Sequence, residues 1–139
     1  MKILFCENVL KPNIVDDAFL DEYNIAKNNG FDVLLYDFND KILKTQCKNN
    51  ELEEIIYRGW MLNIIEYNEL YKELYSKNYK LINNPTEYQN CHYLPDSLKY
   101  IEKYTPKTIF KNIKNENDIS ILIDMVKTFN GKQLLLRIM

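Results

Sequence analysis

The sequence predicts an α/β fold of the Rossmann-like class, a mostly parallel sheet of four to five strands with helices on both faces. Short apolar runs alternate with amphipathic stretches along the chain, which is the pattern of strands alternating with helices. The runs are almost continuously apolar, as in strands that are covered on both faces. With 139 residues, of which 46% are apolar, the chain is long enough to build a real core.

Four strands are predicted from apolar runs, over residues 2–6, 31–36, 54–58 and 80–83. After the first run, apolar residues recur at helical spacing behind Asp16 and Asp17, and Gly30 stands where a left-handed residue ends a helix. After the third run, an amphipathic helix carries Tyr67 and Leu70 on one face. The stretch between the second and third runs is polar and fits either a small extra strand or a turn of helix, around residues 42–43.

Past the fourth strand the chain predicts mainly helices. Asn84, Pro85 and Glu87 have the order of an N-cap, a first residue and a third residue, so a short helix should run through Cys91. Further elements are expected as a helix from Pro95, a possible short strand over residues 108–110, a helix capped by Asn117 or Asp118 that ends near Gly131, and a terminal apolar run over residues 133–139.

Composition excludes several classes of protein. The net charge is −2, so no basic excess exists to release counterions from a nucleic acid or to attract an anionic membrane. The three cysteines are far apart, which argues against a disulfide framework and for a reducing compartment. Neither a signal peptide nor a membrane span is recognisable, and we expect a cytoplasmic protein. The three glycines, Gly30, Gly59 and Gly131, are far apart, so the chain cannot contain a GxGxxG or GxxxxGK phosphate loop.

Ligands of open parallel sheets bind beyond the carboxyl ends of the strands. At one such end, Arg58 follows a strand and is freed by Gly59, so it could clamp a carboxylate or a phosphate with two hydrogen bonds. The alternative is that Arg58 pairs with a local acid while Trp60 fills the edge of the domain. The other strand ends carry Glu7 with Asn8, Asp37, and Asn83 with Asn84.

Each remaining candidate also has a structural interpretation. Glu7 could bind a ligand or could cap a helix. Asn84 is chiefly a cap, although amides next to it could meet an anion. His92 has no second metal ligand at a suitable spacing, and its neighbour Cys91 points about 100° away on a helix, so a Cys–His pair is disfavoured. The eleven tyrosines are interpreted as core and rim. No catalytic residue and no metal ligand is predicted.

Two stretches resemble a known family. Residues 57–62 (YRGWML) and residues 81–95 (LINNPTEYQNCHYLP), continuing to residues 104–109 (YTPKTI), look like the amino-terminal part of a bacterial and phage clade of ATP-grasp proteins. The resemblance covers nearly the whole chain, to about Gly131. It implies a pre-ATP-grasp domain over residues 1–110 and the start of an ATP-grasp domain over residues 111–139.

The resemblance implies an enzyme that holds ATP and magnesium between two lobes. Such enzymes phosphorylate a carboxylate and pass the acyl group to an amine. For this clade the resemblance implies ligation of amino acids or peptides. Arg58 would then face the acyl phosphate or the substrate carboxylate, with Trp60, Glu7 and Asn84 nearby. The sequence departs from the family where an Asp-Lys pair is expected near Cys91. It also stops before the strand that carries a lysine in the family and before the acidic metal ligands that follow that strand, as if truncated.

The expected function is therefore the amino-terminal lobe of an ATP-grasp carboxylate–amine ligase that does not bind ATP and magnesium alone and is inactive alone. The face toward the other lobe would be exposed and could drive self-association. The alternative is a small stand-alone domain that holds an anionic ligand or a protein partner at the Arg58 edge. A complete small enzyme of another α/β class is the third hypothesis.

Overall fold

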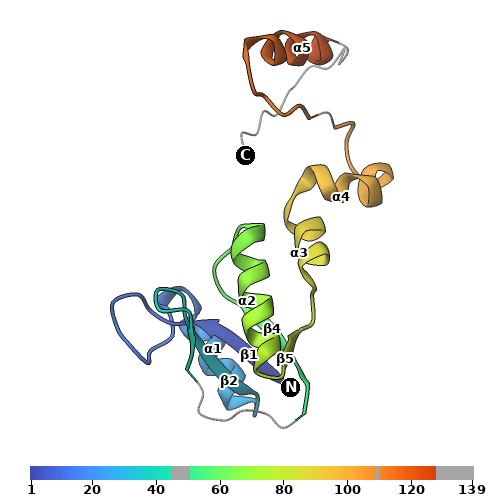
Figure 1. Cartoon of the computed structure of the whole chain (residues 1–139). Coiled ribbons are helices and arrows are strands. Elements are labelled where there is room, and N and C mark those ends of the chain that lie inside the picture. The colour runs from blue at the N-terminus through green and yellow to red at the C-terminus, as the bar shows by residue number, and fades with distance from the viewer. Residues whose placement is uncertain (45–50, 109, 128–139) are drawn as a thin grey trace. The chain divides into compact units, whose positions relative to one another are not determined.

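The structure, a computed structural model, describes residues 1–44, 51–108 and 110–127 (Figure 1). It forms two compact units, of which the first is Met1–His92 and the second begins at Tyr93. The predicted fold class is confirmed, because the first unit is α/β with a mostly parallel, curled, five-stranded sheet. The domain boundary at residue 110, which came from the resemblance, stays a prediction.

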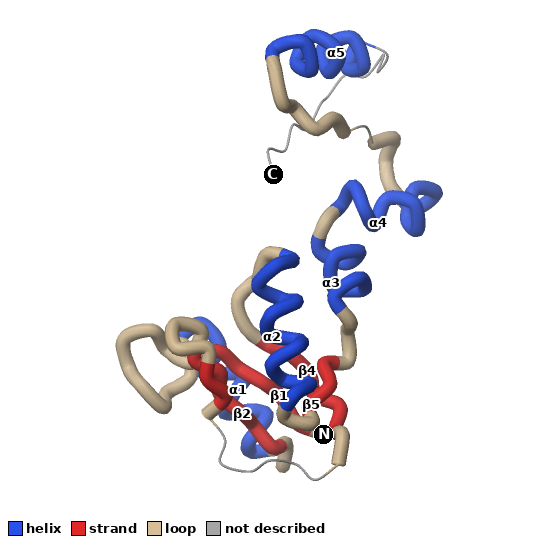
Figure 2. Tube along the Cα trace, viewed as in Figure 1, coloured by secondary structure: helices blue, strands red, loops and turns tan. Residues whose placement is uncertain are grey.

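The sheet has the strand order β3-β2-β1-β4-β5 (Figure 2). Parallel pairing joins β1 to both β2 and β4, and joins β4 to β5. The short β3 runs antiparallel to β2, so the extra strand that the sequence allowed is present. The strand bounds are Lys2–Cys6 for β1, Asp32–Asp37 for β2, Ile42–Leu43 for β3, Glu53–Arg58 for β4 and Tyr79–Leu81 for β5.

One helix lies against each face of the sheet. On one face α1 (Leu20–Asn28), which follows a 3-10 turn over Asp17–Phe19, packs Ala26 against Phe5 and its neighbours. On the other face α2 (Ile64–Ser76) packs Leu70 and Leu74 against the larger cluster, which includes Leu4 and Ile55. Helix α3 (Pro85–His92) contacts α2. Successive strand residues therefore serve opposite faces, as the two-residue period of a strand requires.

The helix signals predicted at Gly30 and Asn84 are confirmed in this unit, and Asn63 adds a cap that was not predicted. Gly30 has a φ of 78° just after α1, a conformation in which a Cβ would be strained. Asn63 caps α2 through a reciprocal capping box with Glu66. Asn84 caps α3 in the same way: its side chain accepts hydrogen bonds from the amides of residues 86 and 87, and Glu87 accepts from the amide of Asn84.

The second unit contains α4 (Leu94–Ile101), a 3-10 turn over Glu102–Tyr104 and α5 (Glu116–Lys127). The predicted cap of α5 is wrong by two residues or more, because the side chain of Asn115 accepts the hydrogen bond from the amide of Asp118. Neither Thr108 nor Phe110 lies in a strand. The predicted helix end near Gly131 and the terminal apolar run lie outside the described residues.

A tyrosine pocket at the carboxyl edge of the sheet

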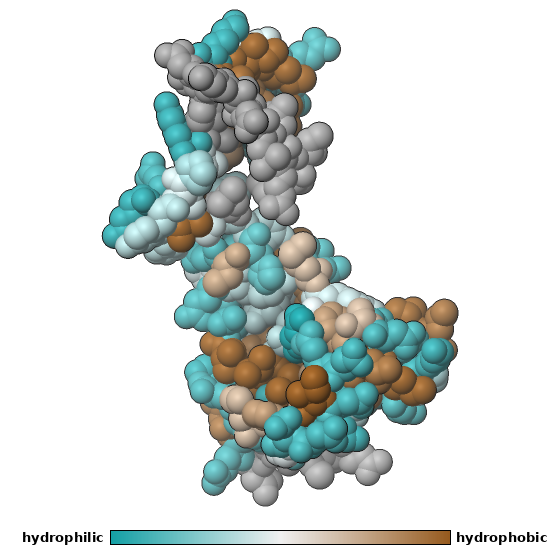
Figure 3. Space-filling model, turned by 180° about the vertical axis from the view of Figure 1, so that it is seen from behind, coloured by the Kyte–Doolittle hydropathy of each residue, from teal (hydrophilic) through white to brown (hydrophobic). Residues whose placement is uncertain are grey.

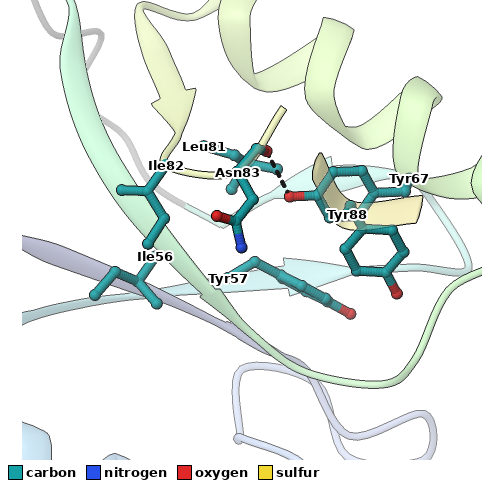
Figure 4. A pocket seen from close by; sticks show the side chains of 7 residues that line it. All are labelled: Ile56, Tyr57, Tyr67, Leu81, Ile82, Asn83 and Tyr88. Atoms are coloured by element: carbon teal, nitrogen blue, oxygen red, sulfur yellow. Dashed lines mark hydrogen bonds between the residues drawn. The ribbon is translucent and has the colours of Figure 1, made fainter. Parts of the chain in front are cut away.

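A small pocket opens where β4 and β5 stop pairing. The last paired residue of β5 is Leu81, opposite Ile55, whereas β4 continues to Arg58. The space left beyond β5 is a cavity of about 80 Å³ at the carboxyl edge of the sheet (Figure 4). We call it the tyrosine pocket. It is lined by Ile56, Tyr57, Tyr67, Leu81, Ile82, Asn83 and Tyr88.

Tyr88 of α3 forms the back of the tyrosine pocket. Its ring stacks on that of Tyr67 from α2, with the centroids 3.7 Å apart and the planes 11° apart. Its hydroxyl accepts a hydrogen bond of 2.8 Å from the amide of Leu62 and donates one of 3.1 Å to the carbonyl of the same residue. Tyr88 therefore fixes the wall and satisfies a buried peptide unit at once.

The other two tyrosines also direct their hydroxyls at the backbone. Tyr67 donates to the carbonyl of Asn83 at 2.8 Å, the bond drawn in Figure 4, and Tyr57 donates to the carbonyl of Trp60 at 2.7 Å. Burial raises the pKa of both Tyr57 and Tyr67 well above the ordinary tyrosine value. These hydroxyls therefore stay protonated and act as donors to the backbone, which leaves mainly ring carbon facing the cavity.

Asn83 supplies the polar group at the mouth of the tyrosine pocket. The residue is exposed, and its side-chain amide points toward Tyr57 between the tyrosines and the two isoleucines (Figure 4). Its backbone carbonyl is held by Tyr67, so the position of the residue is fixed. A carboxamide offers both donors and an acceptor, so Asn83 can pair with an amide or a carbonyl of a bound molecule.

Gly59 lets the chain leave β4 beside the pocket. A Cβ added at Gly59 would lie 2.7 Å from the hydroxyl oxygen of Tyr57 and 2.8 Å from its ring carbons. The close approach of the backbone to this ring explains why a glycine stands between Arg58 and Trp60.

Arg58 does not line the tyrosine pocket. Its side chain lies on the α1 face, where Nε donates to Oε2 of Glu22 and Nη2 donates to Oε1 at 2.6 Å. The guanidinium also lies over the ring of Phe19, 5.2 Å from the centroid. The guanidinium of Arg58 therefore already has a bidentate partner, the carboxylate of Glu22. The pair is about half exposed, so a competing anion would meet little resistance.

Glu7 is the buried member of a separate group of charges, whose other members, Lys44 and Asp37, are partly exposed. It is 3% exposed, and Oε1 accepts a hydrogen bond from the amide of Asn13. Oε2 lies 3.5 Å from Nζ of Lys44, which is also 3.3 Å from Oδ2 of Asp37. These contacts link the ends of β1 and β2 to the residue that follows β3. Glu7 therefore acts as a structural anchor here.

Trp60 and Asn84 are likewise occupied by local contacts. The ring of Trp60 packs on Phe38, with the centroids 5.4 Å apart. Burial raises the pKa of the nearby Cys6 thiol to about 11, opposed by a hydrogen bond from the backbone of Trp60, so this thiol is no ready nucleophile. The side chain of Asn84 is committed to capping α3. A binding role for any of these residues stays a prediction.

The structure thus distributes the predicted site residues over four places. Arg58 faces α1, Trp60 faces the turn after β2, Glu7 is buried beside Lys44, and Asn84 caps α3. The tyrosine pocket is built from Asn83, which the sequence had placed at a strand end, and from residues that the sequence had assigned to strands and to the core or rim. The two-residue period of β4 could have predicted that Arg58 and the tyrosine pocket lie on opposite faces of the sheet. Tyr57 and Arg58 are neighbours in a strand, so their side chains must point to opposite faces.

A second hollow of about 310 Å³ lies on the α1 face of the sheet, with Arg58 and Glu22 at its rim. Its walls are largely apolar, and Ile25 beside it is 61% exposed. Figure 3 shows apolar surface on this unit interrupted by hydrophilic side chains. The predicted self-association through an exposed face stays a prediction, and this hollow is one surface that could serve it.

In residues 1–44, 51–108 and 110–127, no three or more side chains of His, Cys, Asp and Glu gather in a way that could hold a metal ion. None of the helices in these ranges has the length and apolar content to cross a membrane.

Comparison with known proteins gives no match: no family model, no curated protein and no solved structure is similar to this chain.

Proposed function

We propose that residues 1–92 act as the substrate-holding, amino-terminal lobe of an ATP-grasp-type carboxylate–amine ligase. The tyrosine pocket is the observation that carries the proposal, because it lies at the carboxyl edge of a parallel sheet, where such folds hold ligands. The two stretches that carry the family resemblance supply most of it. Residues 57–62 contribute Tyr57, and residues 81–95 contribute Leu81, Asn83 and Tyr88.

The start of α3 offers few free backbone amides to the phosphates of a nucleotide. At the start of α3 the side chains of Asn84 and Glu87 already take three backbone amides, and Glu87 adds a negative charge that repels phosphate. A glycine-rich phosphate loop is excluded by the sequence. ATP and magnesium are therefore assigned to another lobe, and the chain alone is expected to bind a substrate without turning over ATP.

Titration of the isotope-labelled 139-residue chain, followed by NMR, tests the proposal. Amino acids and dipeptides are expected to shift the amide resonances of Asn83, Tyr57 and Tyr88 in a saturable way, whereas ATP with magnesium leaves them unchanged. A parallel assay measures release of ADP or AMP. Turnover of ATP by the purified chain, or the absence of a saturable shift with every amino acid and dipeptide, contradicts the proposal.

The second candidate function is a stand-alone domain that holds an anion at Arg58. The half-exposed ion pair favours it, because an exposed salt bridge is worth only about 0–1 kcal/mol and an incoming carboxylate or phosphate can replace Glu22. Glu22→Gln is then expected to tighten binding of inorganic phosphate or acetate, and Arg58→Ala to abolish it. Equal, weak responses of both variants and the wild type count against this candidate.

A further inference from the structure

We infer that the tyrosine pocket selects an uncharged, branched aliphatic side chain of an amino acid or peptide, whose backbone amide pairs with the carboxamide of Asn83. This inference rests on the proposed function and names the substrate class of the same site. Three properties of the pocket carry it: its size, the state of its polar groups and the position of Asn83.

Size excludes rings. The cavity is about 80 Å³, roughly half of the 150 Å³ or so that holds a benzene molecule in a protein core. Water occupies about 30 Å³ per molecule in the liquid, so the space suits about three non-hydrogen atoms. An isopropyl group, which is also the branched end of a leucine side chain, has this size, whereas a phenyl ring or a nucleobase is too large.

The polar groups around the cavity disfavour a charged ligand group and favour an apolar one. Among the residues that the structure describes, none with a charged side chain lines the tyrosine pocket. The hydroxyls of Tyr57, Tyr67 and Tyr88 each hold a backbone carbonyl, so binding a polar group inside would require breaking one of these bonds. A carboxylate or carboxamide placed there would lose its water without a new partner, which is costly. Methyl groups that pack against Ile56 and the tyrosine rings give up no hydrogen bonds to water, and their burial is favourable.

Asn83 stands where the backbone of such a ligand would leave the cavity. It is exposed at the mouth, and its side-chain amide points toward Tyr57 (Figure 4). Within the described residues, no hydrogen bond is recorded for this carboxamide, whereas the carbonyl of the same residue is fixed by Tyr67. A peptide amide has one donor and one acceptor, so it can form two hydrogen bonds with a carboxamide.

A series of nearly isosteric ligands tests the selection. N-acetyl-leucinamide, N-acetyl-asparaginamide and N-acetyl-aspartamide differ in side-chain polarity and charge but little in shape, and N-acetyl-phenylalaninamide adds size. NMR titration of the full chain is expected to give the leucine compound a dissociation constant on the order of 1 mM. The asparagine compound should bind about tenfold more weakly, and the aspartate and phenylalanine compounds more weakly still.

Two variants locate the binding. Ile82→Phe should fill the cavity and weaken binding of the leucine compound about tenfold or more, whereas Ile42→Phe is the matched control, since the two isoleucines are 48% and 46% exposed. Asn83→Ala should weaken binding roughly three- to tenfold by removing the amide pairing, with Asn24→Ala on α1 as its control.

The outcomes separate this inference from the proposed function. Binding of amino acids with a preference for the aspartate or phenylalanine compound, or binding that Ile82→Phe leaves unchanged, overturns the inference and leaves the substrate-holding lobe standing. Failure of every blocked amino acid and every dipeptide to bind, or ATP turnover by the chain alone, overturns the proposed function with it.

Discussion

The ring of Tyr88 lies flat on the ring of Tyr67, with the centroids 3.7 Å apart. This stack joins α3 to α2, and the hydroxyl of Tyr88 extends the connection to Leu62 at the start of the segment that enters α2. One side chain therefore holds together two helices and the loop before them. The integrity of the tyrosine pocket depends on that side chain more than on any other.

Tyr88→Phe should destabilise the first unit while keeping the stack. The change leaves the buried amide of Leu62 without the hydroxyl that now lies 2.8 Å away, and an unsatisfied buried group costs about 1–3 kcal/mol. Urea unfolding followed by circular dichroism measures the loss. Tyr75→Phe serves as the control, because Tyr75 is 52% exposed. Equal midpoints for the two variants would show that the hydroxyl of Tyr88 contributes nothing.

The Arg58–Glu22 pair should contribute little to stability despite its bidentate geometry. Both side chains are about half exposed, so solvent screens the attraction, and exposed pairs contribute about 0–1 kcal/mol. A double-mutant cycle with Arg58→Ala and Glu22→Ala measures the coupling by urea unfolding. A coupling clearly above 1 kcal/mol would mean that stacking on Phe19 and the ion pair form a rigid structural unit, which leaves no room for exchange with an anion.

Glu7→Gln should cost more stability than the loss of an exposed carboxylate. Glu7 is 3% exposed, and its charge lies beside Lys44 in the cluster at the ends of β1 and β2. Removing the charge leaves Lys44 with Asp37 alone, and we expect a loss of about 1–3 kcal/mol, because Lys44 keeps contact with solvent. Asp17→Asn removes a carboxylate from an exposed pair with Lys11 and should change stability by less than about 0.5 kcal/mol. A smaller effect at Glu7 than at Asp17 would refute this assignment.

Stability should fall as the pH rises above about 9. Burial raises the pKa of the Cys6 thiol from 9.0 to about 11, so the folded chain keeps a proton that the unfolded chain has lost. This stabilisation is complete below about pH 9 and is lost as the pH approaches 11, a change on the order of 1–3 kcal/mol. Above pH 10 the raised pKa of Tyr57 acts with the same sign.

Urea unfolding at about pH 8 and about pH 10 measures this dependence. Cys6→Ala removes the thiol and should flatten the curve between these values, although it lowers stability at both. The fall in the free energy of unfolding that remains above pH 10 in this variant is assigned to the buried tyrosines. An unchanged slope in Cys6→Ala would show that the thiol of Cys6 ionises equally easily in the folded and unfolded chains.

Local signals made much of the fold predictable. The order of Asn84, Pro85 and Glu87 fixes the start of α3, and Gly30 fixes the end of α1, because each signal acts through backbone groups within four residues. The same kind of signal failed for α5, where Asn115 outcompetes two later residues that are also good caps.

The site was less predictable because it depends on contacts between distant residues. Tyr67 and Tyr88 recur at helical spacing, so periodicity marks them as core residues and says nothing of where their hydroxyls go. That these hydroxyls reach the backbone of Asn83 and Leu62 follows only from how α2 and α3 pack. Arg58 ends β4 as predicted, and the alternation of side chains along β4 directs it to the α1 face, where it pairs with Glu22, 36 residues earlier.

The alternation of side chains along β4 gives neighbouring residues two different environments. Tyr57 belongs to the pocket on one side and Arg58 to the salt bridge on the other, although the two residues are adjacent. Ile56, between β1 and the edge of the sheet, lines both the tyrosine pocket and the hollow beside the salt bridge. A one-residue insertion within β4 would exchange the environments of Tyr57 and Arg58 and disrupt both surfaces at once.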